Sequence, residues 1–255
     1  GSVMETASWR DRVDAILVAW QPGIEGGNSV ADILTGKVNP SGKLTMTWPI
    51  AATDHPSTAN FAKEYDMYTY KNMEGWGKGN IPGVDFSNHE EDIYVGYRYF
   101  DTFKKDVAYP FGFGLSYTTF EMGKPSVKAN GKNIEVSVTV KNTGKVAGKQ
   151  VAQVYVTAPK GAYEKPAKEL KAFGKTRELK PGESQTLKMT LEKRDLASFD
   201  EANSQWKVDA GNYLFQVGTD VESIKGTATL KVAEYTEKTS SACAPNVQLN
   251  YLKQK

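Results

Sequence analysis

The residues best suited to acid–base chemistry in this sequence are three consecutive acids, Glu90, Glu91 and Asp92. They stand beside a run of aromatic residues, where a carboxyl group could act as a general acid or base. Neighbouring side chains on an extended chain point to opposite sides, so Glu90 and Glu91 do not readily form a catalytic pair. Two interpretations stay open, a solvated turn and a surface that faces a substrate.

Other chemistries fit the sequence poorly. Residues 36–44 are similar to a phosphate-binding loop, but they contain one residue too many and no Ser or Thr follows Lys43. Residues 114–118 lack the second glycine of a nucleophile elbow. The two histidines, His55 and His89, have no cysteine nearby, which argues against a zinc site. We therefore expect no metal and no cofactor.

The chain before these acids has the pattern of a βαβ unit. Residues 13–20 are almost continuously apolar, which predicts a strand covered on both faces. After a glycine-rich turn, Asn28 or Ser29 is expected to cap a short helix that ends at Gly36. Residues 43–48 then alternate between apolar and polar types, which predicts a second strand.

A single βαβ unit cannot cover its own sheet. Parallel sheets carry helices on both faces, and this unit supplies one helix. The pattern shows no further alternation of strand and helix before residue 120. We therefore expect residues 1–119 to be the terminal piece of a larger α/β domain, whose remaining strands lie outside this sequence.

Residues 50–106 contain many aromatic side chains and little periodicity. A structureless loop of this length is uncommon in a compact domain unless it is functional or packs on another surface. Aromatic, irregular surface is typical of a ligand cleft or a domain interface.

From about residue 120 the pattern becomes that of an all-β domain. Alternating runs separated by turn residues predict seven short strands, at 134–140, 151–156, 170–173, 186–191, 206–208, 213–217 and 228–232. This spacing predicts an immunoglobulin-like sandwich over residues 120–235, and the lack of a cysteine pair favours the fibronectin type III variant. The predicted fold class is thus α+β and multidomain, a partial α/β sandwich followed by this β-sandwich. The polar tail, 236–255, is expected to be loosely attached or docked on another surface.

Composition limits the partners of the chain. The 255 residues carry a net charge of only +2, with both signs spread along the sequence, so we expect no nucleic-acid or membrane partner. No apolar run approaches the length that spans a bilayer. The single cysteine, Cys243, rules out an internal disulfide. We expect a periplasmic or secreted location, with a cytoplasmic one as the alternative.

Several motifs, in order along the chain, resemble glycoside hydrolase family 3. Those similar to the family's C-terminal α/β sandwich are residues 19–27 (AWQPGIEGG), 36–44 (GKVNPSGKL), 94–101 (YVGYRYFD) and 109–120 (YPFGFGLSYTTF). Asn142, Thr143, Gly144 and Gly148, followed by Gln153 and Tyr155, resemble the family's fibronectin type III-like domain. One departure is Thr45, where the family commonly has proline.

The resemblance implies an enzyme that hydrolyses β-linked glucosides with retention. Such a mechanism uses two carboxylates about 5–5.5 Å apart, one as nucleophile and one as acid/base. The family's nucleophilic aspartate lies in an N-terminal barrel and its acid/base glutamate lies before the stretch with which this sequence begins, so we assign no catalytic residue here. The chain is then a C-terminal fragment, inactive alone, whose partners are the barrel, the remaining sandwich strands and, through the complete enzyme, a carbohydrate.

The candidate substrate-binding residues are Trp76, Glu90 and Glu91. Trp76 stands between two glycines and could present a flat apolar face to a sugar ring; alternatively, it packs beneath the barrel. Arg98 is expected to form a structural ion pair or a stacked guanidinium.

Two other functions stay open for the sandwich. It could bind carbohydrate by itself, although its strands lack an obvious row of exposed aromatic residues. It could also have a purely structural role, as a brace for the catalytic domains or as the interface of a homodimer.

Overall fold

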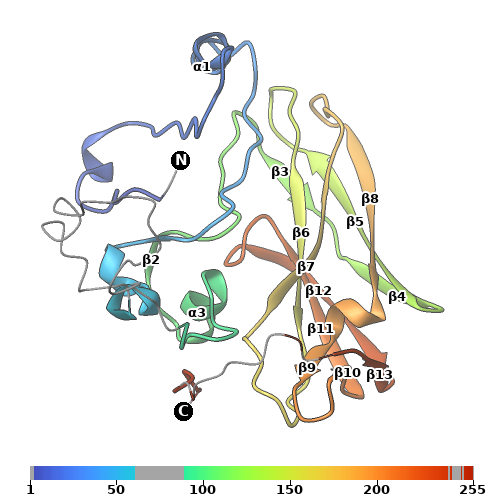
Figure 1. Ribbon diagram of the computed structural model, residues 1–255. Helices are drawn as coiled ribbons and strands as arrows, with labels where there is room; N and C mark the ends of the chain where they lie inside the picture. Colours follow the sequence, from blue (N-terminus) through green and yellow to red (C-terminus); the bar gives the residue numbers. More distant parts are fainter. Residues whose placement is uncertain (1–2, 61–88, 241, 243–247, 249, 255) are drawn as a thin grey trace, which may run out of the picture.

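The computed structural model describes residues 3–60, 89–240, 242, 248 and 250–254. Two regions lie beside each other (Figure 1). The N-terminal region, residues 3–60 and 89–117, is irregular with short helices, and the sandwich, residues 118–238, is built mostly of strands. The predicted α+β architecture with a β-sandwich is confirmed.

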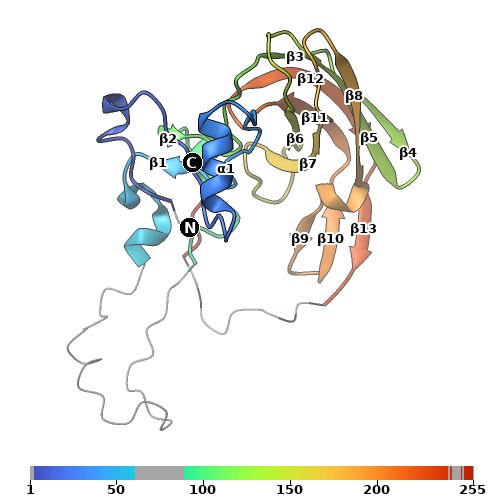
Figure 2. The same ribbon diagram turned by 90° about the horizontal axis from the view of Figure 1, so that it is seen from above.

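The sandwich consists of two facing sheets (Figure 2). One sheet has the order β12-β11-β6-β7, and in the other β5 is the central strand. Because β8 pairs with β5 along almost its whole length, β3 and β4 share the opposite edge of β5. The strands are β3 (Phe120–Met122), β4 (Ser126–Asn130), β5 (Asn133–Asn142), β6 (Val151–Thr157), β7 (Glu169–Lys175), β8 (Ser184–Glu192), β11 (Gly211–Gly218) and β12 (Ile224–Val232).

Six of the seven predicted strands lie in these two sheets. The seventh, predicted at 206–208, is β10 (Gln205–Val208), and its expected place in the sandwich is wrong. It pairs with β9 (Ser198–Asp200) and β13 (Tyr235–Lys238) in a separate three-stranded sheet that follows the short helix η4 (Lys193–Leu196). Periodicity predicts a strand but not its partners, and here Trp206 packs on Phe199 with 5.3 Å between ring centroids.

The core of the sandwich follows from the alternation of its strands. On β5, every second side chain, from Ile134 to Val140, is at most 2% exposed, and the intervening ones face outward. These side chains pack against Val154, Phe215 and Val217 of the other sheet. Complete burial of one such side chain contributes about 1.5–3 kcal/mol, so the alternation fixes the register of the sheets.

Tyr213, at the start of β11, fixes the turn that leads into this strand. Its side chain is fully buried, and its hydroxyl donates a hydrogen bond to the main-chain oxygen of Asp209 at 3.0 Å. A tyrosine that bonds back to the chain a few residues upstream is a tyrosine corner, a hallmark of immunoglobulin-like sandwiches.

The predicted βαβ unit is only partly formed in the N-terminal region. Residues 13–20 form no strand; Val13 is 45% exposed and Leu17 is 39% exposed. The second predicted strand, 43–48, is reduced to β1 (Trp48–Pro49), which pairs with β2 (Val107–Tyr109). The strand predicted at 13–20 is wrong because a strand needs neighbours for its main-chain hydrogen bonds, and the described chain supplies none beside these residues. The strand predicted at 43–48 is wrong except at its end, where Trp48 pairs with β2.

The predicted helix of this unit is present as α1 (Gly26–Leu34). Its N-terminal cap is Glu25, three residues before Asn28 and four before Ser29, the two predicted caps. The carboxylate of Glu25 accepts a hydrogen bond from the side chain of Asn28 at 2.7 Å. It ends as predicted before Gly36, whose φ of +76° suits glycine at the end of a helix. The other helices of this region are η1 (Arg10–Arg12), η2 (Ala52–Asp54), η3 (Pro56–Asn60) and α3 (Tyr97–Thr102).

Candidate functional site

The acidic cluster lies in a tight turn that precedes α3. The N–H of Asp92 donates to the oxygen of His89 at 3.3 Å, and the N–H of Tyr94 donates to the oxygen of Glu91 at 2.8 Å. Asp92 has a φ of +50°, which is uncommon for residues other than glycine. The turn therefore has a defined conformation in which Glu91 is buried and Glu90 is half-buried.

Glu91 differs from a solvated surface acid. It is 7% exposed, and its Oε1 lies 3.3 Å from Nδ1 of His89. Its Oε2 is buried and has no hydrogen-bond partner among the described residues. A buried carboxylate oxygen without a donor is energetically costly, so this oxygen requires a hydrogen-bond donor from outside the described residues. The cluster thus lies in a turn, as one of the two interpretations expects, but Glu91 is buried in this turn and not solvated.

The predictions for Trp76 and Arg98 have different outcomes. Trp76 lies outside the described residues, so its predicted contact with a sugar stays a prediction. Arg98, on α3, forms the predicted ion pair, with 2.9 Å between its Nη2 and Oε1 of Glu169 on β7. This ion pair is part of the junction between the two regions.

Helix α3 attaches to the loop between β6 and β7 and to the start of β7 through three further contacts. Thr102 Oγ1 accepts a hydrogen bond from the N–H of Ala167 at 2.9 Å, and Lys168 lies 3.1 Å from Asp101. Tyr97 accepts a hydrogen bond from the N–H of Leu170 at 2.8 Å. Burial raises the pKa of Tyr97, so its hydroxyl stays protonated and serves in hydrogen bonding.

Below α3, a buried glutamine holds two chain segments to the sandwich. Gln153 on β6 donates to the main-chain oxygens of Gly112, at 3.1 Å, and Thr219, at 2.6 Å. Its own oxygen accepts a hydrogen bond from the hydroxyl of Tyr155 at 2.6 Å. Gly112 has a φ of +84°, and a Cβ there would meet the Gln153 side chain at 2.2 Å. Glycine is therefore required at position 112.

Two motif stretches that are far apart in sequence meet at Asn39. Its Nδ2 donates to the oxygen of Ala147 at 3.0 Å, and its Oδ1 accepts from the N–H of Tyr117 and from Ser116 Oγ. Beside Asn39, the two stretches approach so closely that a Cβ at Gly114 would lie 2.3 Å from the main-chain oxygen of Gly42. Sequence reasoning identified both stretches but not their contact; the glycines were the available signal.

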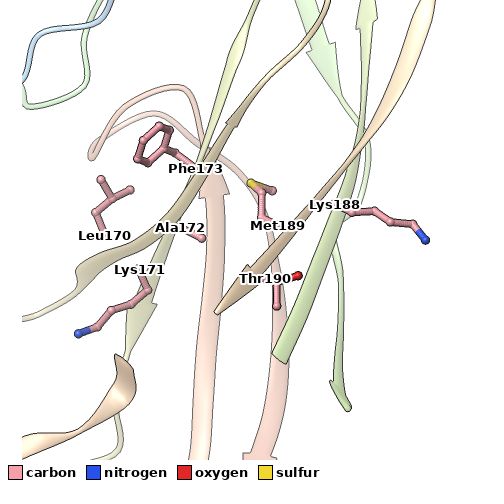
Figure 3. A pocket seen from close by; sticks show the side chains of 7 residues that line it. All are labelled: Leu170, Lys171, Ala172, Phe173, Lys188, Met189 and Thr190. Atoms are coloured by element: carbon pink, nitrogen blue, oxygen red, sulfur yellow. The ribbon is translucent and has the colours of Figure 1, made fainter. Parts of the chain in front are cut away.

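An open groove of about 450 Å³ lies on the sandwich between β7 and β8 (Figure 3). We call it the β7–β8 groove; its lining residues are Leu170, Lys171, Ala172, Phe173, Lys188, Met189 and Thr190. Phe173 is 70% exposed, although it is a large apolar side chain. Such exposure often marks an interaction surface.

The described part of the chain has neither a metal-binding cluster nor a membrane-spanning helix. No three His, Cys, Asp or Glu residues there lie in a group that could hold a metal ion. No helix there is long and apolar enough to cross a membrane.

An irregular α/β segment docked on an immunoglobulin-like sandwich is a pair of domains from a larger multidomain protein. Comparison with known families identifies both parts. Residues 1–117 match the glycosyl hydrolase family 3 C-terminal domain, and residues 150–221 match a fibronectin type III-like domain. The chain belongs to glycosyl hydrolase family 3.

Known relatives agree with this assignment. The chain is 41% identical to a "Beta-glucosidase" of Kluyveromyces marxianus over 226 residues, and 42% identical to "Beta-glucosidase A" of Butyrivibrio fibrisolvens over 249 residues. Each match covers 88% of this chain but only 24% and 28% of the respective relative. The chain thus spans about a quarter of the length of these curated relatives.

A solved structure shows the same fold. β-Glucosidase 3B from Thermotoga neapolitana, in complex with glucose, matches with a TM-score of 0.83 and 46% identity. The match covers 93% of this chain and 31% of that chain.

Proposed function

We propose that this chain is the C-terminal part of a retaining β-glucosidase-like glycoside hydrolase that acts on β-linked gluco-oligosaccharides or glycosides. The observation that carries the proposal is the likeness, at 46% identity, to a β-glucosidase solved with glucose. Retention requires a nucleophile and an acid/base carboxylate about 5–5.5 Å apart, and both are assigned to polypeptide outside this sequence. The chain alone is therefore expected to be inactive.

In the complete enzyme, the turn with Glu90 and Glu91 contributes one wall of the sugar cleft. Glu91 Oε2 supports this role, because it has no hydrogen-bond partner among the described residues and a carboxylate oxygen is a strong acceptor for sugar hydroxyls. Trp76 provides an apolar face for a sugar ring in the same proposal. The sandwich braces the catalytic domains through the contacts of α3, Gln153 and Asn39.

A chimera tests the proposal. Residues 3–255 replace the corresponding part of the Thermotoga neapolitana enzyme, and hydrolysis of an aryl β-glucoside is measured for the chimera and for this chain alone. We expect activity only in the chimera. Activity in the isolated chain would refute the assignment of the carboxylates to other polypeptide. A folded but inactive chimera, beside an active parent enzyme, would refute the glucosidase proposal.

Within an active chimera, Glu91→Gln tests the cleft wall. Removing the charge of an acceptor that contacts a sugar hydroxyl weakens binding by about 1.5–3 kcal/mol, so KM for the glucoside should rise at least tenfold. Glu90→Gln is the matched variant at the neighbouring acid, and the variant with the larger rise in KM identifies the acid that faces the sugar. Unchanged KM in both variants would remove this turn from the cleft.

A second, structural role is favoured by one observation, the exposed Phe173 on the last strand of its sheet. We propose that the free edge of β7 pairs with β7 of a second copy. A twofold axis at Ala172 would place Glu169 of one copy opposite Lys175 of the other, which gives a pair of complementary charges on each side of the axis.

Light scattering tests this dimer. The chain should have twice its monomer mass of 28.1 kDa, and Phe173→Asp should restore the monomer. Val146→Asp, at another exposed apolar residue, should leave the dimer intact. A monomeric mass for the unchanged chain at high micromolar concentration would refute the role.

A further inference from the structure

The C-terminal tail contacts both regions of the molecule. The described end of the chain, residues 250–254, lies near α3 in Figure 1. Residues 250–254 have no regular secondary structure, and Leu252 is half-buried between exposed neighbours. Hydrogen bonds from this segment reach the acidic turn, through Glu90 and Tyr94, and the loop between β6 and β7, through Glu164 and Lys165.

Main-chain and side-chain groups both take part in this contact. The N–H of Leu252 donates to the main-chain oxygen of Glu90 at 2.7 Å. The side-chain nitrogen of Gln254 donates to Tyr94 Oη at 3.0 Å and to the main-chain oxygen of Lys165 at 2.7 Å. A side-chain amide has two N–H donors, so both bonds can form at once.

Tyr94 connects the three segments. It is 1% exposed, and its hydroxyl donates to the carboxylate of Glu164 while accepting from Gln254. Its ring packs edge-on against Phe103, with 5.0 Å between centroids. The hydroxyl is therefore satisfied as donor and as acceptor only when the tail is in place.

We propose that the acidic turn and the loop between β6 and β7, at Glu164 and Lys165, form a groove that binds the chain's own C-terminal peptide, and that Gln254 thereby positions the turn that carries Glu91. The main-chain bond to Glu90 lies next to Glu91, so the tail restrains the residue that presents the free carboxylate oxygen. Gln254 touches no substrate and acts as a positioning residue.

Hydrogen–deuterium exchange of the full chain tests the groove without any activity measurement. Gln254→Glu keeps the size of the side chain but replaces both donors with a carboxylate oxygen facing Lys165 O and Glu164. We expect exchange at residues 89–96 to accelerate about tenfold, in line with the loss of two hydrogen bonds. Lys253→Gln, at an exposed neighbour without a described partner, is the matched control and should leave exchange unchanged.

A peptide added in trans gives an independent test. In a chain that ends at Ser240, residues 89–96 should exchange as fast as in Gln254→Glu, and a saturating synthetic peptide of residues 246–255 should restore their protection. The same peptide with alanine at the position of Gln254 should fail. Equal exchange in the unchanged chain, the truncated chain and Gln254→Glu would overturn the proposal.

The positioning of Glu91 rests on the proposed function and is tested separately in the active chimera. There Gln254→Glu should raise KM about threefold or more while kcat is retained, and Gln254→Asn, which keeps the donors, should recover part of the loss. Altered exchange with unchanged KM would overturn the positioning of Glu91 and leave the peptide groove standing. An inactive chimera would bear on the proposed function alone.

Discussion

The two regions of this molecule bury their apolar side chains very differently. Every member of the sandwich core cluster lies between Met122 and Val232. In the described part of the N-terminal region, the buried apolar side chains are Trp48, Tyr94, Phe100 and Ala108, whereas eleven large ones, from Met4 to Tyr117, are exposed. In the described part of the sandwich, only Val146 and Phe173 are so exposed.

Buried polar atoms divide in the same way. The five that lack a hydrogen-bond partner among the described residues belong to Thr6, Thr47, Trp48, Glu91 and Asp101, all in the N-terminal region. Folded proteins satisfy nearly all such atoms. The sandwich thus contains its own core, whereas the N-terminal region has surfaces and polar atoms that require further polypeptide or a ligand.

The largest effect expected from this comparison is in the sandwich core. Phe215→Ala removes a fully buried ring and should lower the free energy of unfolding by about 3–5 kcal/mol, measured by urea denaturation. The matched change in the other region, Leu17→Ala, affects a side chain that is already 39% exposed and should cost about 0.5 kcal/mol or less. Similar losses in both variants would contradict the difference between the regions.

The next effect concerns a buried amide. Asn142 is fully buried; its nitrogen donates to the oxygens of Val146 and Leu179 at 2.8 Å, and its oxygen accepts from Thr118 Oγ1 and the N–H of Gly144. Asn142→Ala leaves these partners without a bond and should cost about 3 kcal/mol in urea denaturation. Asn133→Ala, at the exposed end of β5, is the control with a cost of about 0.5 kcal/mol or less. Equal costs would show that the network adds nothing.

The same comparison explains which elements could be predicted from the sequence. The strands of the sandwich bury one face each, so the alternation of residues such as Ile134 and Val136 specified them correctly. The strand at 13–20 was predicted from an equally clear apolar run. A strand covered on both faces needs neighbouring strands, and the described residues provide none beside 13–20. Local pattern therefore predicted structure only where the partners of an element lie in the same chain.

The candidate site shows a similar limit. The sequence identified the acids of the turn and the ion pair of Arg98, because residue type and spacing are local information. It could not show that Glu91 is buried while Glu90 is half-buried, or that Gln254, more than 150 residues later, bonds to Tyr94. Those contacts depend on how the two regions dock.

A smaller, local effect is expected at the junction. Asn39→Ala removes the bonds to Ala147, Ser116 and Tyr117, so the opening free energy of residues 110–117 should fall by about 1–2 kcal/mol. Hydrogen exchange should accelerate there, while amides of β5 and β11 keep their protection. Asn28→Ala, whose side chain bonds only within the start of α1, is the control. Faster exchange throughout the sandwich would mean that the two regions unfold as one unit.

The smallest effect at neutral pH, and the most specific one, is expected for Tyr94→Phe. Burial, together with the carboxylate of Glu164, raises the pKa of Tyr94 from 10.0 to about 12. Between these values the folded chain retains the phenol proton that the unfolded chain has released. Stability contributed by this group is therefore complete below pH 10.0 and falls as the pH rises toward about 12.

Urea midpoints at pH 8, 10 and 11 measure this dependence. The stability advantage of the unchanged chain over Tyr94→Phe, about 1 kcal/mol at pH 8, should shrink at pH 11, because only the unchanged chain must keep the Tyr94 phenol protonated. Tyr213, in the sandwich, has a pKa raised by burial to about 12 and stays in both proteins, so alkaline destabilisation should persist in the variant with a smaller slope. Identical slopes would mean that Tyr94 titrates like a solvated phenol, and that the contact between the acidic turn, Glu164 and the tail does not form in solution.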